Sequence, residues 1–283
     1  MSTAIRRPAD PRALWATLSQ TERDAAYDNV KAVTNSAALI AERNAASEQA
    51  RTTLKSVLDQ PYGPRERNKI DLYPASDPNA PCLVFIHGGY WQRNSREMFA
   101  MLVEGIAAHG WSVAIPGYTL APEASLTEIV GEIRQALDWL GANGATHGVS
   151  GQLITSGWSA GGHLVAMTLD HPQVAAGLAI SGVYELAPVH DTELNDKLKL
   201  TGAEIEALSP LRRPVVNKRL DIAYGGSELP ALVLDSIYLH ERRVAASAPG
   251  RLLPIDGADH FSILAELRRP DGQLTKAALG LVS

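Results

Sequence analysis

The sequence predicts an α/β fold, in which helices cover both faces of a mostly parallel, doubly wound sheet. Short apolar runs of strand length recur from about residue 70 to residue 255. Segments whose apolar residues have helical spacing separate these runs. Alternation of strands with helices is typical of a parallel sheet, and 283 residues are enough for one such domain.

The first 60 residues differ from the rest and are expected to form a helical cap or flank. Residues 11 to about 58 are rich in Ala, Glu, Arg, Gln and Ser and contain no glycine. Their apolar positions predict a short helix around Leu14 and a longer one from Ala37, which Leu54 and Leu58 continue. The flank has too few large apolar residues for a core of its own. We therefore expect residues 1–60 and the catalytic domain, residues 61–283, to form one structural unit.

The apolar runs predict the strands in order along the chain. Residues 70–73 alternate like an edge strand, which Pro74 ends. The other runs are more continuous, as expected for strands covered on both faces. They comprise residues 82–86, 111–115, 152–156, 178–180, 220–224 and 252–255. Amphipathic helices are expected over residues 129–140 and directly after residue 159, with a weaker candidate over 237–244.

Composition excludes several classes of protein. A net charge of −5 without basic clusters argues against a nucleic-acid partner. No apolar stretch approaches the roughly 20 residues needed to cross a bilayer, and Met1–Pro8 lacks the apolar block of a secretory signal. Cys82 is the only cysteine and lies in an apolar strand, which indicates a small buried side chain. These features predict a cytoplasmic protein without a metal site.

The segment Gly157-Trp158-Ser159-Ala160-Gly161 stands between a predicted strand and a predicted helix. A serine flanked by glycines at such a junction is the pattern of a nucleophile elbow, in which a sharp turn lifts the hydroxyl above the sheet. Side chains at the two glycine positions would collide with the strand or the helix. The pattern also occurs by chance, so the prediction depends on partners for Ser159.

A serine nucleophile needs a general base, and His260 has the right context for it. It follows the strand at residues 252–255 through a short loop and precedes a helix-like segment. In this kind of fold such a histidine arches back over the sheet toward the serine. The other histidines after the serine are interpreted as surface or core residues: His163, His171, His190 and His240.

The acid that orients the histidine should follow the strand at residues 220–224. Glu228 lies in that loop and is the first candidate. Asp256 is the second candidate, although it is close to His260 in sequence. Asp221 lies inside a strand and Asp235 in the following helix, so neither is expected to reach the histidine.

The segment His87-Gly88-Gly89-Tyr90-Trp91 directly follows the strand at residues 82–86. Glycines there allow backbone N–H groups to face a developing oxyanion, together with the N–H of Ala160 at the start of the next helix. A tight turn with a buried histidine is the alternative interpretation. The elbow, Glu228 and His260 in the expected order favour the catalytic one.

These motifs carry a family resemblance over residues 20 to 267. The chain resembles α/β-hydrolases of the hormone-sensitive-lipase and arylformamidase-like esterase group, and His-Gly-Gly-Tyr-Trp is similar to the kynurenine formamidase branch. Further matching segments are 22–29, 71–74, 118–123 and 259–261. The resemblance implies Ser159 as nucleophile, Glu228 as acid and His260 as base. It also implies oxyanion donors at Gly89, Tyr90 and Ala160, with Gly88 shaping the turn. Glutamate stands where the formamidase branch often has aspartate.

The expected function is hydrolysis of small carboxylic esters through an acyl-enzyme, without a cofactor. Aromatic residues next to the motifs predict a compact pocket for a small or aryl substrate, although the same residues could instead pack the core. With Gly88, the expected pocket residues are Trp91, Trp158 and Tyr184. The alternatives are an arylformamidase and, more remotely, a non-catalytic binding protein with the hydrolase fold. The expected partner is a small-molecule ester, and a homodimer stays an open alternative to a monomer.

Overall fold

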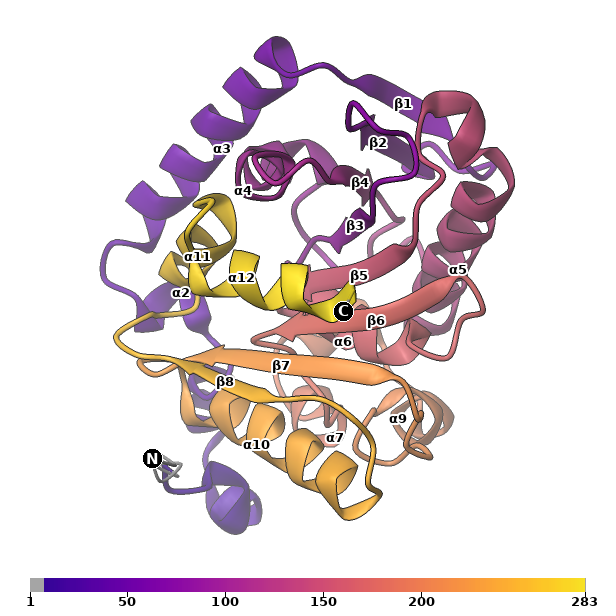
Figure 1. Ribbon diagram of the computed structural model, residues 1–283. Helices are drawn as coiled ribbons and strands as arrows, with labels where there is room; N and C mark the ends of the chain where they lie inside the picture. Colours follow the sequence, from indigo (N-terminus) through magenta and orange to yellow (C-terminus); the bar gives the residue numbers. More distant parts are fainter. Residues whose placement is uncertain (1–7, 283) are drawn as a thin grey trace.

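The computed structural model describes residues 8–282, so the predictions made for residues 1–7 fall outside the described part of the chain. An eight-stranded sheet runs through the molecule in the order β1-β2-β4-β3-β5-β6-β7-β8 (Figure 1). The strands are β1 (Val57–Pro61), β2 (Lys69–Tyr73), β3 (Cys82–Ile86), β4 (Ser112–Pro116), β5 (Leu153–Trp158), β6 (Val174–Ile180), β7 (Arg219–Gly225) and β8 (Leu252–Ile255). β2 pairs antiparallel with β1 and β4, and all other pairs are parallel. The predicted α/β-hydrolase fold class is confirmed.

Helices cover both faces of the sheet because side chains alternate along each strand. In β3, Val84 and Ile86 point into one core, and Leu83 and Phe85 point into the other. The first core is closed by α5 (Leu126–Asn143), α6 (Ala160–Thr168) and α10 (Pro230–Ala245). The second is closed by η2 (Arg96–Leu102), α4 (Val103–Ala107), α11 (Ala265–Arg268) and α12 (Gln273–Leu279).

Shorter helices occupy the connections on the side of α6 and α10. They are η3 (Gly144–His147), α7 (Ala187–His190), α8 (Asn195–Leu198) and α9 (Gly202–Leu208). η4 (Ser262–Leu264) follows the predicted catalytic histidine, and η5 (Gly280–Val282) ends the described chain. The segment between β6 and β7 therefore holds α7, α8 and α9 before the chain returns to the sheet.

The N-terminal segment is helical, as expected, but it also supplies the first strand. It contains η1 (Pro11–Thr17), α1 (Gln20–Ala25), α2 (Asn29–Ala32) and α3 (Ser36–Thr53). The prediction that Leu58 continues the long helix is wrong, since Leu54 is already extended and Leu58 lies in β1. Pairing with β2 provides this segment with a ladder of hydrogen bonds, which outweighs its weak helical pattern. α3 packs against η2 at the edge of the second core.

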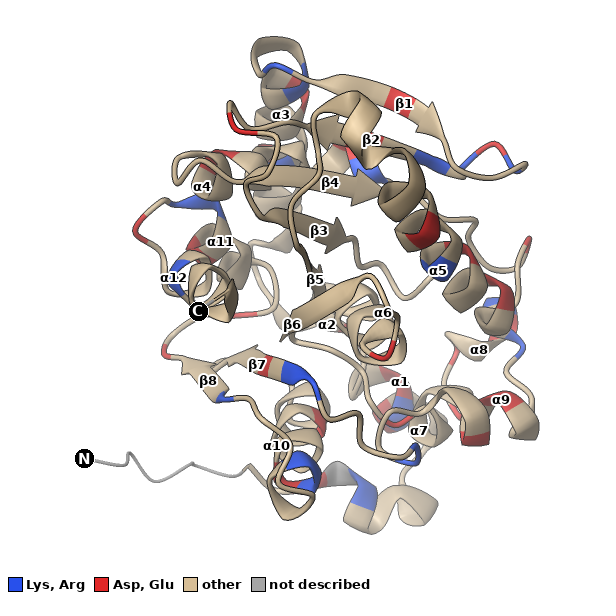
Figure 2. Ribbon diagram, turned by 45° about the vertical axis from the view of Figure 1, so that its right-hand side comes forward, with Lys and Arg blue, Asp and Glu red and all other residues tan. Residues whose placement is uncertain are grey.

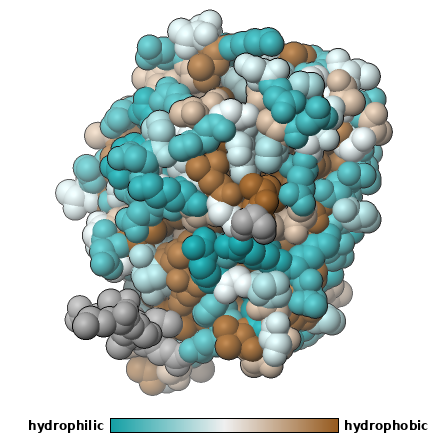
Figure 3. All heavy atoms as spheres, in the orientation of Figure 1, coloured by the Kyte–Doolittle hydropathy of each residue, from teal (hydrophilic) through white to brown (hydrophobic). Residues whose placement is uncertain are grey.

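The surface is mixed in charge and polarity. Figure 2 shows acidic and basic positions interspersed over the outer helices. On the face seen in Figure 3, apolar residues form small groups among polar ones. Within residues 8–282, no helix combines the length and the apolar character needed to span a membrane.

Candidate active site

Ser159 occupies a strained turn between β5 and α6. Its backbone angles, φ 58° and ψ −120°, are ones that residues with a side chain rarely adopt. A Cβ atom at Gly157 would collide with the carbonyl oxygen of Gly161, and one at Gly161 with the carbonyl oxygen of Ile86. Only glycine fits at both positions, which confirms the steric part of the elbow prediction. The turn places the serine at the carboxyl edge of the sheet.

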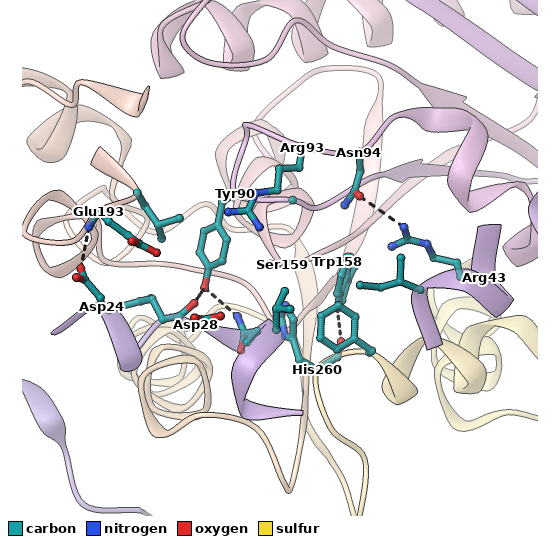
Figure 4. A pocket seen from close by; sticks show the side chains of 17 residues that line it. Asp24, Asp28, Arg43, Tyr90, Arg93, Asn94, Trp158, Ser159, Glu193 and His260 are labelled. Carbon is teal, nitrogen blue, oxygen red and sulfur yellow. Dashed lines mark hydrogen bonds between the residues drawn. The ribbon is translucent and has the colours of Figure 1, made fainter. Parts of the chain in front are cut away.

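Glu228 and His260 come together at the same edge of the sheet. They lie in the loops after β7 and β8, which run parallel to β5, so all three loops open toward one side. Nδ1 of His260 lies 3.4 Å from Oε2 of Glu228, and both side chains are buried. This contact is long for a hydrogen bond. His260 and Ser159 line the same cavity (Figure 4).

Both side chains of this pair are fixed by further contacts. Oε1 of Glu228 accepts hydrogen bonds from the Ser181 hydroxyl at 2.5 Å and from the Gly225 N–H at 2.9 Å. The Trp158 indole N–H donates to the carbonyl oxygen of His260 at 2.7 Å, and the two rings lie 4.8 Å apart. With Nδ1–H facing Glu228, the other ring nitrogen of His260 is left as a proton acceptor.

The other candidates for base and acid lie outside this cavity. Nε2 of the buried His163 lies 2.8 Å from the carbonyl oxygen of Leu208, and burial lowers the pKa of His163 to about 4. Asp256 is exposed, and the buried Asp221 pairs with Arg251. The three other histidines after Ser159 have different surroundings. His171 contacts Asp138, His190 contacts Asp191, and His240 is half-buried on α10.

The loop after β3 lies against the elbow. A Cβ at Gly88 would lie 2.9 Å from Cβ of Ser159 and 2.5 Å from the carbonyl oxygen of Trp158. Gly89, Tyr90 and Trp91 all have positive φ, at 118°, 51° and 56°. Within residues 8–282, the backbone N–H groups of Gly89, Tyr90 and Ala160 donate no hydrogen bond to the protein. These N–H groups are therefore free to bind an anionic oxygen.

Side chains from outside the motif brace this loop. Nδ2 of Asn94 donates to the carbonyl oxygen of Gly88 at 3.1 Å, and the Tyr118 hydroxyl donates to that of His87 at 2.9 Å. The His87 ring stacks on Tyr118, and its burial lowers the pKa of His87 to about 3. His87 is thus a neutral, structural residue beneath the loop.

The N-terminal segment holds the same loop from the other side. The hydroxyl of Tyr90 donates to the carbonyl oxygen of Tyr27 at 2.7 Å. It also accepts a hydrogen bond from Nδ2 of Asn29 at 2.8 Å. Residues 27–29 are therefore connected directly to Tyr90.

The cavity has a volume of about 120 Å³, and the N-terminal segment forms one of its walls. Trp158, Tyr90 and Phe261 supply aromatic surface. The N-terminal residues of the wall are Asp24, Tyr27, Asp28, Asn29, Val30, Ile40 and Arg43. The motifs do not reveal these residues. The only signal in the sequence is the similarity of residues 22–29 to the opening segment of the formamidase branch.

The prediction that Trp91 and Tyr184 line the pocket is wrong. Both side chains are fully buried in the first core and do not face the cavity. The positive φ of Trp91 turns its ring inward, where it packs edge-on against His163 at 4.9 Å. Gly88 lies behind the cavity wall and sets the distance between the loop and the elbow.

Charged residues stand on opposite sides of the serine. In Figure 4, Asp24, Asp28 and Glu193 lie beyond Tyr90, while Arg43 lies beyond Trp158. In the described part of the chain, no three His, Cys, Asp or Glu side chains are arranged to hold a metal ion. The site combines a serine, a histidine–carboxylate pair and free N–H groups, the groups that acyl transfer by a serine requires.

Comparisons with known proteins agree with this geometry. The BD-FAE family model matches residues 70–173. Kynurenine formamidase of Danio rerio is 28% identical over 83% of this chain and 85% of its own length. Esterase LipC of Mycobacterium tuberculosis is 31% identical over 44% of this chain and 35% of its own length.

Solved structures show the same architecture. A protein from a Silicibacter species, provisionally described as a thioesterase, has a TM-score of 0.82 at 29% identity and covers 91% of this chain and 99% of its own. An esterase from Pyrobaculum calidifontis has a TM-score of 0.70 at 18% identity, covering 94% and 99%. The predicted resemblance to the hormone-sensitive-lipase and arylformamidase-like α/β-hydrolases is confirmed, and the chain is a hydrolase.

Proposed function

We propose that this hydrolase cleaves small carboxylic esters by serine catalysis, with Ser159 as nucleophile, His260 as general base and Glu228 as the acid that orients it. One observation carries the proposal: the strained Ser159, the His260 of a buried histidine–glutamate pair, and Gly89 and Tyr90 with their free N–H groups all line one cavity. Each of these parts has a place in acyl transfer.

In the proposed mechanism, His260 removes the proton of Ser159 as the serine oxygen attacks the acyl carbon. The tetrahedral oxyanion accepts hydrogen bonds from the N–H groups of Gly89, Tyr90 and Ala160. His260 then gives its proton to the leaving alkoxide, and an acyl-enzyme results. Water, deprotonated by His260, attacks the acyl-enzyme; His260 then returns this proton to the oxygen of Ser159 as the bond to the acyl group breaks and the acid is released. Each N–H donor contributes on the order of 3 kcal/mol of transition-state stabilisation.

An arylformamidase is the second candidate. It is supported by the kynurenine formamidases of Danio rerio and Salmo salar, which match 83% of this chain, whereas the esterase relatives from Mycobacterium tuberculosis match 44% and 38%. The same residues would carry the reaction, with a formyl group on Ser159 and an amine as leaving group. Because an amine leaves only after protonation, this reaction depends more strongly on His260 as a general acid. Trp158, Tyr90 and Phe261 offer an aromatic surface to an aryl amine.

A direct comparison of rates tests both candidates. We would measure kcat/KM of the purified chain for short p-nitrophenyl esters and for N-formylkynurenine, with the Ser159→Ala variant as control. A higher value for the esters supports the first candidate, and a clear preference for the formyl amide replaces it with the second. If neither class is hydrolysed and a fluorophosphonate probe does not label Ser159, the serine mechanism is wrong and the non-catalytic alternative takes its place.

A further inference from the structure

Arg43 is a buried arginine with no acidic partner on the wall of the active-site cavity. It comes from α3 and is 7% exposed. Within residues 8–282, it forms no ion pair with a carboxylate. Nε and Nη2 donate to the side-chain oxygen of its neighbour Asn44, and Nη2 lies 3.5 Å from Oδ1 of Asn94. The guanidinium stands 4.5 Å above the ring of Phe99, and Nη1 donates no hydrogen bond to the described chain.

The other buried arginines within residues 8–282 are compensated. Arg96 pairs with Asp59 and Asp71. Arg243 donates to three backbone carbonyl groups, those of Val216, Lys218 and Pro249. Buried charges are normally paired, because an isolated charge in an apolar setting is costly. Consistent with this cost, burial lowers the pKa of Arg43 to about 10. At neutral pH Arg43 remains a cation without a counter-ion.

The position of Arg43 indicates where an anion would bind. Ile40 and Phe261 line the cavity next to it, and a second hollow of about 130 Å³ shares these two residues and Arg43. Arg43 thus stands where the two hollows meet. The second hollow also contains Glu42, whose carboxylate pairs with Arg268 at 3.7 Å. The carboxylates of Asp24, Asp28 and Glu193 lie on the opposite side of Ser159 (Figure 4), where they would repel an anion.

We propose that Arg43 binds a carboxylate group of the substrate, so that the enzyme prefers acyl compounds that carry a negative charge on the side of Trp158 and Phe261. This inference rests on the proposed function, since it concerns the cavity of Ser159. The free Nη1 of the guanidinium can donate a charge-assisted hydrogen bond to a carboxylate, while Nε and Nη2 keep the group in place through Asn44. Binding would give Arg43 the counter-ion that the protein itself does not provide.

Matched pairs of esters test the proposal on either side of the scissile bond. The first pair is 4-acetoxybenzoate and its methyl ester, which differ in the charge of the leaving group. The second is mono-4-nitrophenyl adipate and 4-nitrophenyl hexanoate, which differ in the charge of the acyl chain. We expect the wild type to prefer the anion in at least one pair. Arg43→Gln should lower kcat/KM for that anion by about 10- to 100-fold, and leave the neutral ester nearly unchanged.

Two further variants separate charge from geometry. Arg43→Lys keeps the charge and loses the fork, so it should retain part of the preference. Arg93→Gln is the matched control, because Arg93 lines the same cavity but is exposed and lies on the Tyr90 side. Its charge is screened by water, and we expect it to change the preference by less than about threefold.

The outcomes that would overturn the proposal are distinct from failure of the proposed function. Equal losses for anionic and neutral esters in Arg43→Gln would make Arg43 a brace for Asn94, not an anion-binding residue. A wild-type preference for the neutral ester in both pairs would also overturn it. Hydrolysis of no ester at all would instead refute the proposed function. If Arg43→Gln does not fold, the test uses the wild type and compares its inhibition by 4-hydroxybenzoate with its inhibition by the neutral 4-hydroxybenzamide. We expect the anion to inhibit more strongly, and equal inhibition would overturn the proposal.

Discussion

Oε2 of Glu228 lies 3.4 Å from Nδ1 of His260, while Oε1 of the same carboxylate accepts two hydrogen bonds from other residues. The hydroxyl of Ser181, after β6, and the N–H of Gly225, at the end of β7, both donate to Oε1. The glutamate is therefore fixed at one oxygen and presents the other to the histidine. This arrangement explains how the side chain of a glutamate, one methylene longer than that of an aspartate, keeps a defined position.

The first prediction concerns the identity of the acid. Glu228→Ala should lower kcat for a short p-nitrophenyl ester by about 10³- to 10⁴-fold, since the histidine loses both orientation and charge stabilisation. Asp256→Ala should change kcat by less than about twofold, because Asp256 is an exposed loop residue that does not line the cavity. The two variants would be assayed side by side, and a large loss confined to Asp256→Ala would refute the assignment of Glu228.

The second prediction concerns the strain at Ser159. Ser159→Ala should abolish esterase activity and leave the free energy of unfolding nearly unchanged, because alanine keeps the Cβ at φ 58°. Ser159→Gly should be equally inactive but about 1–3 kcal/mol more stable than Ser159→Ala, since glycine adopts this conformation without strain. Urea unfolding of the two variants measures the difference. Most of the activity surviving in Ser159→Ala would exclude Ser159 as the nucleophile.

The sequence sufficed for the parts of the site that depend on local backbone geometry. The elbow needs glycine at positions 157 and 161 because carbonyl groups crowd both, and this demand is visible in five residues. The alternation of strands and helices then fixes which loops share an edge with Ser159. Glu228 and His260 could therefore be paired without knowledge of any contact between them.

The cavity wall could not be predicted in the same way. Asn29 and Arg43 belong to helices whose neighbours in sequence carry no catalytic pattern, and their role depends on how the N-terminal segment folds back over the sheet. Trp91 and Tyr184 are adjacent to motif residues, but adjacency does not say which way a side chain points. A positive φ at Trp91 sends its ring into the core, and no pattern in the sequence marks that angle.

The third prediction concerns the link between the N-terminal segment and the free N–H groups. Tyr90→Phe removes the hydroxyl that joins Asn29 to the carbonyl oxygen of Tyr27. We expect kcat to fall about tenfold, a part of the loss seen when an oxyanion donor is removed outright. Asn29→Ala should have a similar effect, and the double variant should be no worse than either, because both break one network.

Tyr62→Phe is the matched control for this prediction. Its hydroxyl donates to the carbonyl oxygen of Gly117 in a buried site outside the cavity. The variant should lose a similar amount of stability, about 1–3 kcal/mol, with kcat unchanged. Equal falls in kcat for Tyr62→Phe and Tyr90→Phe would show that stability alone is responsible.

The fourth prediction concerns pH and His163. Burial lowers the pKa of His163 to about 4, against an ordinary value near 6.5. Between these values the unfolded chain binds more protons than the folded one, so the free energy of unfolding falls as the pH falls through this window. His163→Gln can keep an N–H facing the carbonyl oxygen of Leu208 but cannot titrate. For this variant, the fall in the free energy of unfolding per pH unit should be smaller than for the wild type by up to about 1.4 kcal/mol.

Urea unfolding at several pH values from 8.5 to 4.5 measures this slope for the wild type and for His163→Gln. The two slopes should coincide above pH 7.5, where histidine is neutral in both states. Identical slopes throughout the range would mean that His163 is not shielded from protonation in the folded protein.

The fifth prediction contrasts a glycine that has no room for a side chain, Gly88, with one that has open space around it, Gly131. A Cβ at Gly88 would lie 2.5 Å from the carbonyl oxygen of Trp158, so Gly88→Ala must push the loop away from the elbow. We expect kcat to fall by about 10²-fold, as for loss of one oxyanion donor.

Gly131 lies on the exposed side of α5, with no atom within 4 Å of an added Cβ. Gly131→Ala should raise the free energy of unfolding by about 0.5–1 kcal/mol, because alanine restricts the unfolded chain and favours the helix. It should leave kcat unchanged, since α5 contributes nothing to the cavity wall. Gly88→Ala with full activity would mean that the position of this loop relative to Ser159 does not matter for the reaction, and the N–H groups of Gly89 and Tyr90 would then not be the oxyanion donors.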